Sequence, residues 1–125
     1  MKFPAIRENH LYAKAYSKGN RFVGKLVAVY ILPDYAAKRL QKQHPQKIKV
    51  NRIGLTVTKK LGGAVVRNRT KRIIREAYRK MMQESSLKVG FLVVIAAREA
   101  AVGKKTDDIY RELKYAFQKL GMFGA

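Results

Sequence analysis

The sequence predicts an α+β fold in which helices pack against a small central sheet. Three segments have the apolar spacing of helices, and three shorter segments are rich in β-branched and aromatic residues. They follow one another in the order α-β-β-α-β-α, which is typical of a helix-and-sheet sandwich. No repeat or low-complexity tract interrupts the 125 residues, so we expect a single domain over residues 1–125 that buries a core.

The first predicted helix and strand lie near the N-terminus. Asn9 is a candidate N-cap for a helix over residues 10–18, and Gly19 is a typical left-handed residue at its end. The run FVGKLVAVYIL then predicts one strand over residues 22–32, because β-branched and aromatic residues favour extended structure. Pro33 ends this strand.

The middle of the chain contains a connection, a second strand and a long helix. The polar and basic segment 34–47 predicts a connection with a helical turn around residues 36–40. Alternating apolar and small residues predict the second strand over residues 48–58. The paired glycines of KKLGGAV then turn the chain into a helix over residues 65–83.

The last part of the chain predicts a buried strand and a final helix. The run VGFLVVIA, over residues 89–96, is apolar on both faces and is therefore expected at the centre of the sheet. Thr106 is a candidate N-cap of the final helix, with Asp107 and Asp108 near the positive end of its dipole. Gly121 ends the helix.

The charge of the chain predicts a polyanionic partner. Lys and Arg number 28 and Asp and Glu number 8, which gives a formal charge of +20. Such an excess favours nucleic acid first and an acidic membrane surface second. There is no cysteine, so disulfides, a thiolate nucleophile and Cys-ligated zinc are excluded. We find no secretory signal and no apolar run long enough for a membrane span, and we expect a cytoplasmic protein.

The helix over residues 65–83 separates its charges from its apolar side when its residues are placed about 100° apart. The apolar side carries Val66, Ile73, Ile74, Ala77 and Met81. The candidate phosphate-binding residues, most of them on the opposite side, are Lys59, Lys60, Arg67, Asn68, Arg69, Lys71, Arg72, Arg75 and Arg79. Arg69 lies on the border, and Tyr78 interrupts the pattern as a candidate contact residue. An ordinary solvated face mixes charges of both signs, whereas Glu76 is the only acid from residue 59 to residue 80.

The sequence predicts no catalytic residue and no metal site on the protein. His10 and His44 have no evident partner, and the eight acids are scattered, whereas two-metal chemistry needs converging carboxylates. The stretch LGGAVVRNRTK lacks the GK[ST] of a nucleotide-binding P-loop. Tyrosines such as Tyr12, Tyr16 and Tyr30 could stack on unpaired bases or pack in the core, and composition alone does not distinguish RNA from DNA.

Residues 54–79, GLTVTKKLGGAVVRNRTKRIIREAYR, resemble the signature of the protein subunit of bacterial ribonuclease P. That signature consists of a strand, a Lys-Lys-Gly turn and an Arg-Asn-Arg helix followed by Lys-Arg. A looser similarity covers LYAKAYSKGN, AVYIL and VVIAAR, and leaves residues 34–47 outside. Gly63 departs from the pattern, because members often carry Asn there, and its missing side-chain hydrogen bond predicts a looser turn.

The resemblance implies an α-β-β-α-β-α sandwich with an unusual left-handed βαβ crossover (ribosomal protein S5 domain 2-like), where the general rule favours a right-handed one. It also implies that a catalytic RNA cleaves precursor tRNA with Mg²⁺ and releases the 5′ leader. The protein would bind that RNA through its basic helix and hold the single-stranded leader in a cleft. The Mg²⁺ would serve the RNA-catalysed reaction, with no protein-bound ion and no obligate protein partner.

The positions of the implied leader cleft are Tyr12, Tyr16, Ala28, Tyr30 and Thr56. The basic residues named above would be the RNA-binding set. An alternative is a structural RNA-binding protein of ribosomal type, which would share the charge but would not need a leader cleft. A third class, a DNA-binding module, would place the basic helix in a major groove, but the chain has no helix-turn-helix pattern.

Overall fold

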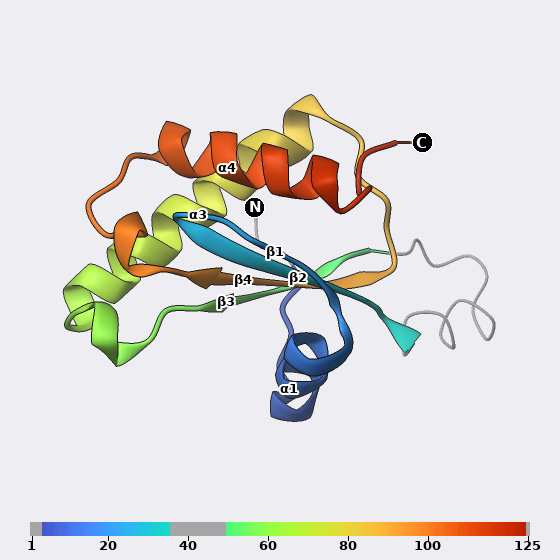
Figure 1. The fold of residues 1–125 in the computed structure, drawn as a ribbon, viewed down its shortest axis with the longest axis horizontal. Coiled ribbons are helices and arrows are strands. Elements are labelled where there is room, and N and C mark those ends of the chain that lie inside the picture. The colour runs from blue at the N-terminus through green and yellow to red at the C-terminus, as the bar shows by residue number, and fades with distance from the viewer. Residues whose placement is uncertain (1–3, 36–49, 125) are drawn as a thin grey trace.

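A computed structural model describes residues 4–35 and 50–124, which form three helices, four strands and two short 3₁₀ turns (Figure 1). In chain order the elements are α1 (Asn9–Lys18), β1 (Asn20–Val23), β2 (Val27–Pro33), β3 (Arg52–Thr56), η1 (Lys59–Leu61), α3 (Ala64–Glu84), β4 (Phe91–Ala97), η2 (Glu99–Ala101) and α4 (Thr106–Lys119). The predicted helical turn over residues 36–40 lies outside the described residues.

The four strands form one mixed sheet in the order β1-β2-β4-β3. β1 with β2 and β2 with β4 are antiparallel, whereas β3 and β4 are parallel and are connected through α3. The predicted α+β fold is therefore confirmed, and so is the central place of β4. The left hand of the crossover stays a prediction of the family resemblance.

The predicted single strand over residues 22–32 is wrong, because this segment is part of a β-hairpin. Residues 20–23 pair with β2, and Val23 lies opposite Ala28. The Gly24 N–H donates to the Val27 carbonyl at 2.9 Å and closes the turn. The element order is consequently α-β-β-β-α-β-α, with one strand more than the sequence pattern indicated.

Two predicted helix starts differ, and the glycine that ends the first helix, as predicted, has a different backbone conformation. Asn9 is the first residue of α1 and not its cap. Gly19 is extended, with φ −74°, and a side chain there would approach a carbonyl oxygen of α1 to 2.6 Å, so close packing and not a left-handed backbone explains the glycine. Thr106 begins α4, and Lys105 precedes it as the cap residue, with its N–H donating to the Asp108 carboxylate at 3.1 Å.

The two faces of the sheet have separate cores (Figure 1). α3 and α4 cover one face, where the alternate strand residues Val27, Val29, Ile31, Ile53, Val93 and Ile95 are buried. α1 covers part of the other face, which we call the α1 face. Its smaller core consists of Ile6, Ala15, Leu32, Leu92 and Val94. Of the described helices, one packs on the α1 face, whereas two pack on the opposite face. A smaller part of the sheet is therefore covered by helix on the α1 face.

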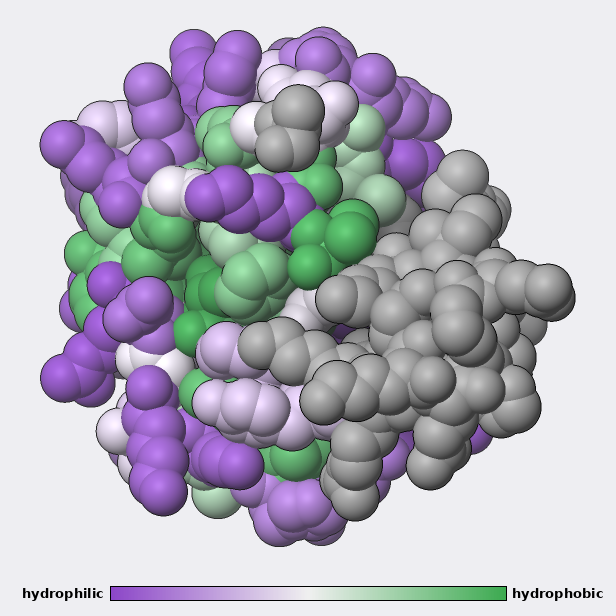
Figure 2. All heavy atoms as spheres, turned by 90° about the vertical axis from the view of Figure 1, so that its right-hand side faces the viewer, coloured by the Kyte–Doolittle hydropathy of each residue, from purple (hydrophilic) through white to green (hydrophobic). Residues whose placement is uncertain are grey.

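The N-terminal segment lies along the outer edge of β3. The Ile53 N–H donates to the Pro4 carbonyl at 2.9 Å, and the Ile6 N–H donates to the Ile53 carbonyl at 3.1 Å. Figure 2 views the end of the molecule at which β3 and β4 begin, where hydrophobic side chains gather between hydrophilic ones. α3 begins at the opposite end of the molecule (Figure 1).

Candidate nucleic-acid interface

The cationic strip of α3 is the most highly charged surface of the described chain. We define it as Arg67, Asn68, Lys71, Arg72, Arg75 and Arg79. Asn68, Arg72 and Arg75 are exposed, while the other three are half-buried. Arg69, on the border of the pattern, is exposed as well. The helix has no acidic residue in its first turn, so its positive dipole end adds to the charge of the strip.

Four cations of the strip are not neutralised by the described part of the protein. Within residues 4–35 and 50–124, no carboxylate lies within ion-pair distance of Arg67, Lys71, Arg72 or Arg75. Glu76 accepts a hydrogen bond from the Thr106 hydroxyl at 3.0 Å and pairs with neither Lys80 nor Arg72. Like charges on one helix face repel one another, and an external polyanion would relieve that repulsion.

Tyr78 is not a contact residue, which corrects the sequence interpretation. Its side chain is only 2% exposed and packs edge-on against Phe117, with ring centroids 6.0 Å apart. Burial raises the pKa of the Tyr78 hydroxyl to about 12. A hydrogen bond with the Asn51 side chain acts in the opposite direction and lowers that pKa. The buried arc of α3 is therefore wider than predicted. Arg67 lies on the same side of the helix as Tyr78 but nearer the N-terminal end of α3. This position explains why its Nε is covered by protein.

The lysines of the turn before α3 lie at the positive end of the helix. Lys59 and Lys60 are exposed in η1, which follows β3 after only two residues. Gly62 has φ +143°, which L side chains rarely adopt, and an added Cβ would lie 3.0 Å from the Val66 side chain. This glycine lets the chain reverse tightly, so the two lysines lie directly before the N-terminal end of α3. We call these two lysines and the cationic strip together the basic surface.

Three of the five predicted cleft residues contact one another on the α1 face. The Tyr16 hydroxyl and the Thr56 hydroxyl share a hydrogen bond of 2.5 Å, which connects α1 to β3. The Tyr16 and Tyr30 rings meet edge-to-face, with centroids 4.9 Å apart and planes at 88°. All three side chains are half-buried. Their exposed parts offer aromatic surface and hydroxyl groups together, as base stacking and sugar contacts require.

Ala28 and Tyr12 border this cluster on different sides. Ala28 pairs with Ala96 across the sheet, and Ala96 pairs with Thr56, so small side chains form one row of the α1 face. Tyr12 lies over Gly54, where an added Cβ would lie 2.5 Å from the phenol oxygen. Burial, and then the charge of Tyr16, raise the pKa of Tyr12. All five predicted positions therefore lie on the same face of the sheet.

Comparisons with known proteins agree with this geometry. Residues 2–121 match the family described as Ribonuclease P. The chain belongs to the ribonuclease P protein family. A ribonuclease P protein component from Clostridium acetobutylicum is 39% identical over 122 residues, which cover 98% of this chain and 92% of that protein. One from Clostridium botulinum is 31% identical over 123 residues, 98% of this chain and 99% of that protein.

Solved ribonuclease P proteins share the fold of this family member. The structure of the Staphylococcus aureus RNase P protein aligns with a TM-score of 0.75 at 27% identity, covering 98% of this chain and 100% of that one. The RNase P protein from Thermotoga maritima aligns with a TM-score of 0.62 at 18% identity over 93% of each chain, which shows the likeness of fold alone.

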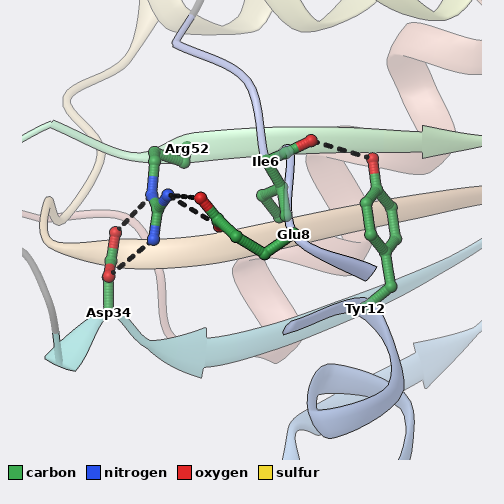
Figure 3. A network of polar contacts seen from close by, with 5 residues as sticks. All are labelled: Ile6, Glu8, Tyr12, Asp34 and Arg52. Carbon is green, nitrogen blue, oxygen red and sulfur yellow. Dashed lines mark hydrogen bonds and ion pairs between the residues drawn. The ribbon is translucent and has the colours of Figure 1, made fainter. Parts of the chain in front are cut away.

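Arg52 is a residue of this family member that the sequence pattern did not single out. Its guanidinium binds the Asp34 carboxylate in two hydrogen bonds, at 2.8 and 3.1 Å, and the Glu8 carboxylate at 3.1 Å (Figure 3). Asp34 is 2% exposed, and the hydrogen bond to it is the main cause that raises the pKa of Arg52. The network joins the start of β3, the end of β2 and the residue before α1, and so holds α1 over the sheet.

Within residues 4–35 and 50–124, the family member has neither a helix long and apolar enough to cross a bilayer nor a group of three acidic or histidine side chains that could hold a metal ion. The two adjacent acids of α4 are instead engaged with the chain's own groups. Asp107 pairs with Lys80 at 3.1 Å, and Asp108 pairs with Arg111 at 2.8 Å.

Replacing Gly63 with Asn is expected to raise the free energy of unfolding by about 0.5–1 kcal/mol, measured by urea denaturation. Gly63 is the N-cap of α3 with φ −72° and makes no side-chain cap. No described atom lies within 4 Å of an added Cβ, so an Asn side chain at this position can cap the helix without strain. Gly62→Ala is the matched control and should destabilise. A less stable Gly63→Asn protein would contradict the open geometry.

Proposed function

We propose that this chain binds the catalytic RNA of ribonuclease P through its basic surface and holds the single-stranded 5′ leader of precursor tRNA on the α1 face. The RNA would carry out the endonucleolytic cleavage. The observation that carries the proposal is the set of four cations of the strip, Arg67, Lys71, Arg72 and Arg75, that form no ion pair within the described residues, together with the short path from them to the aromatic face. Thr56, bonded to Tyr16, ends β3, and only two residues separate it from Lys59, where η1 begins.

This arrangement supports two tasks for one small protein. Lysine and arginine side chains neutralise RNA phosphates and release counterions, which lowers the Mg²⁺ that the folded RNA itself requires. The half-buried rings of Tyr16 and Tyr30 offer a surface for unpaired bases, which suits a leader better than a closed duplex. We assign the Mg²⁺ to the RNA partner, as the family resemblance implies, and no catalytic step to the protein.

The test is cleavage of a precursor tRNA by a bacterial catalytic RNA at low Mg²⁺, with and without the protein. We expect protein-dependent release of an intact 5′ leader. Absence of stimulation, with a folded protein that still binds RNA in a salt-sensitive way, would contradict the proposal. That outcome would favour a structural RNA-binding protein of ribosomal type.

Tyr16→Ala should weaken binding of leader-bearing precursor tRNA by about 1–3 kcal/mol, which is the usual loss when a stacking ring is removed. Binding should be measured by titration of the assembled protein–RNA complex, with leaderless tRNA as the control substrate. Tyr16→Phe keeps the ring and loses only the hydrogen bond to Thr56, so its effect should be smaller. Equal losses for both substrates would indicate a folding defect and not leader contact.

A further inference from the structure

A second basic and aromatic surface lies on the opposite side of the sheet from the α1 face. There α4 passes the turn between β1 and β2, and a cavity of about 520 Å³ opens between them. We call it the α4 cavity. Its lining includes the aromatic rings of Phe22 and Tyr115 and the cations Lys25, Lys104 and Arg111. The volume lies within the roughly 300–1,000 Å³ typical of small-molecule sites.

The two carboxylates of the α4 cavity are engaged by the chain itself. Glu112 accepts the backbone N–H groups of Lys25 at 3.0 Å, Leu26 at 2.7 Å and Val27 at 2.6 Å. This triple acceptor fixes the β1–β2 turn against α4, so one wall of the cavity is preformed. Three of the roughly four lone-pair positions of this carboxylate are thus used by the chain's own N–H groups.

The second carboxylate, that of Asp108, is engaged in the same way. It accepts the Lys105 N–H at 3.1 Å and pairs with the Arg111 guanidinium at 2.8 Å. Those partners lower the pKa of Asp108. The charge of Lys104 also contributes to lowering the Asp108 pKa. Among the described residues, neither Lys25 nor Lys104 forms an ion pair, so an anion from outside could bind between these two ammonium groups.

One aromatic side chain of the cavity, that of Tyr115, lies outside the buried side of α4 and does not contribute to its packed core. Leu113, Ala116 and Phe117 on the core side of the helix are completely buried, whereas Tyr115 is 50% exposed. The Tyr115 ring rests edge-to-face on Phe22, with centroids 5.4 Å apart, and Lys119 Nζ lies 5.4 Å from its centroid. Although Phe22 and Lys119 both contact the ring, half of Tyr115 stays exposed and offers surface for a planar group, and its cationic border favours an anionic one.

We propose that the α4 cavity binds one nucleotide of a single-stranded RNA, with the base against Tyr115 and the phosphate between Lys25 and Lys104. The lining of one cavity contains both an aromatic ring, on which a base can stack, and two ammonium groups without an ion pair, which can bind a phosphate. The site lies on the opposite face of the sheet from Tyr16, so the protein can hold two RNA segments at the same time.

The experiment is a ¹H–¹⁵N NMR titration of the full chain with adenosine 5′-monophosphate and, separately, with a 5′-phosphorylated triadenylate. We expect shifts at the backbone amides of Lys25, Lys104 and Tyr115, and tighter binding of the trinucleotide. Tyr115→Ala should weaken binding at this site roughly 5- to 100-fold, as loss of a stacking ring predicts, while Tyr115→Phe should retain it. Adenosine and inorganic phosphate, each alone, should bind more weakly than the nucleotide.

Matched variants separate this site from the rest of the basic surface. Lys104→Ala should weaken nucleotide binding at the cavity, whereas Lys114→Ala, an exposed lysine of α4 outside the lining, should not. Tyr16→Ala should leave the cavity shifts unchanged, so failure of the leader cleft would not mimic failure here. Shifts confined to α3 or the α1 face, or an unchanged affinity in Tyr115→Ala, would overturn the proposal. Equal affinity for the mononucleotide and the trinucleotide would overturn RNA as the occupant.

Discussion

Replacing Arg52 with Ala is expected to lower the free energy of unfolding by about 3–5 kcal/mol, because it removes the guanidinium from a buried carboxylate. Asp34 is 2% exposed and receives two hydrogen bonds from Arg52, at 2.8 and 3.1 Å (Figure 3). The change should be measured by urea unfolding followed by circular dichroism.

Two further variants test the physical cause. Adding Asp34→Ala to Arg52→Ala removes the charge that would otherwise stay buried, so the double variant should recover part of the lost stability. Glu8→Ala should cost no more than about 1 kcal/mol, because the Glu8 side chain is 42% exposed and its ion pair is screened by water. A single Arg52→Ala variant within 1 kcal/mol of the original protein would contradict this account.

The Arg52 network also shows what sequence reasoning could not reach. The three residues of this network, Glu8, Asp34 and Arg52, lie 18 to 44 residues apart in the sequence. In the sequence alone each counts only as one charge toward the net charge of the chain. These three residues meet because the strand order places the end of β2 and the start of β3 on either side of β4. Arg52 is therefore engaged within the protein, and its charge is not free for RNA.

Local patterns predicted the cationic strip well, because helical periodicity alone separates its two sides. The same pattern failed at Tyr78, which lies about 20° from Arg67 on the helix at roughly 100° per residue. α3 packs against both the sheet and α4, so its buried arc is wider than its aliphatic residues indicate. The edge-on contact between Tyr78 and Phe117 of α4 belongs to that wider arc.

The hairpin was missed for a related reason. Residues 22–32 are almost continuously apolar, and only Gly24 indicated a break. The turn is held by the Glu112 carboxylate, which lies 85 to 87 residues away in the sequence. A contact over that distance leaves no local signal. The aromatic face, in contrast, was predicted through the family resemblance, and its five positions do lie on one side of the sheet.

Removing four cations of the strip together should have the largest effect on RNA binding. The variant changes to Ala the residues Arg67, Lys71, Arg72 and Arg75. Each lost phosphate contact flattens the plot of log K against log salt by about 0.7–0.9, so four should flatten it by about 3. Affinity for the catalytic RNA at low salt should fall by several orders of magnitude. Filter binding across a range of salt concentrations measures both quantities.

Net charge alone would also weaken RNA binding, so the control must change the charge equally. Four exposed cations outside the strip serve this purpose when changed to Ala: Arg7, Lys18, Lys88 and Lys114. Both variants reduce the formal charge of +20 by four, yet only the first removes the charges that one helix face presents together. If the strip contacts RNA phosphates, the control variant keeps most of the slope. Equal slopes in the two variants would show that the RNA responds to total charge and not to the α3 surface.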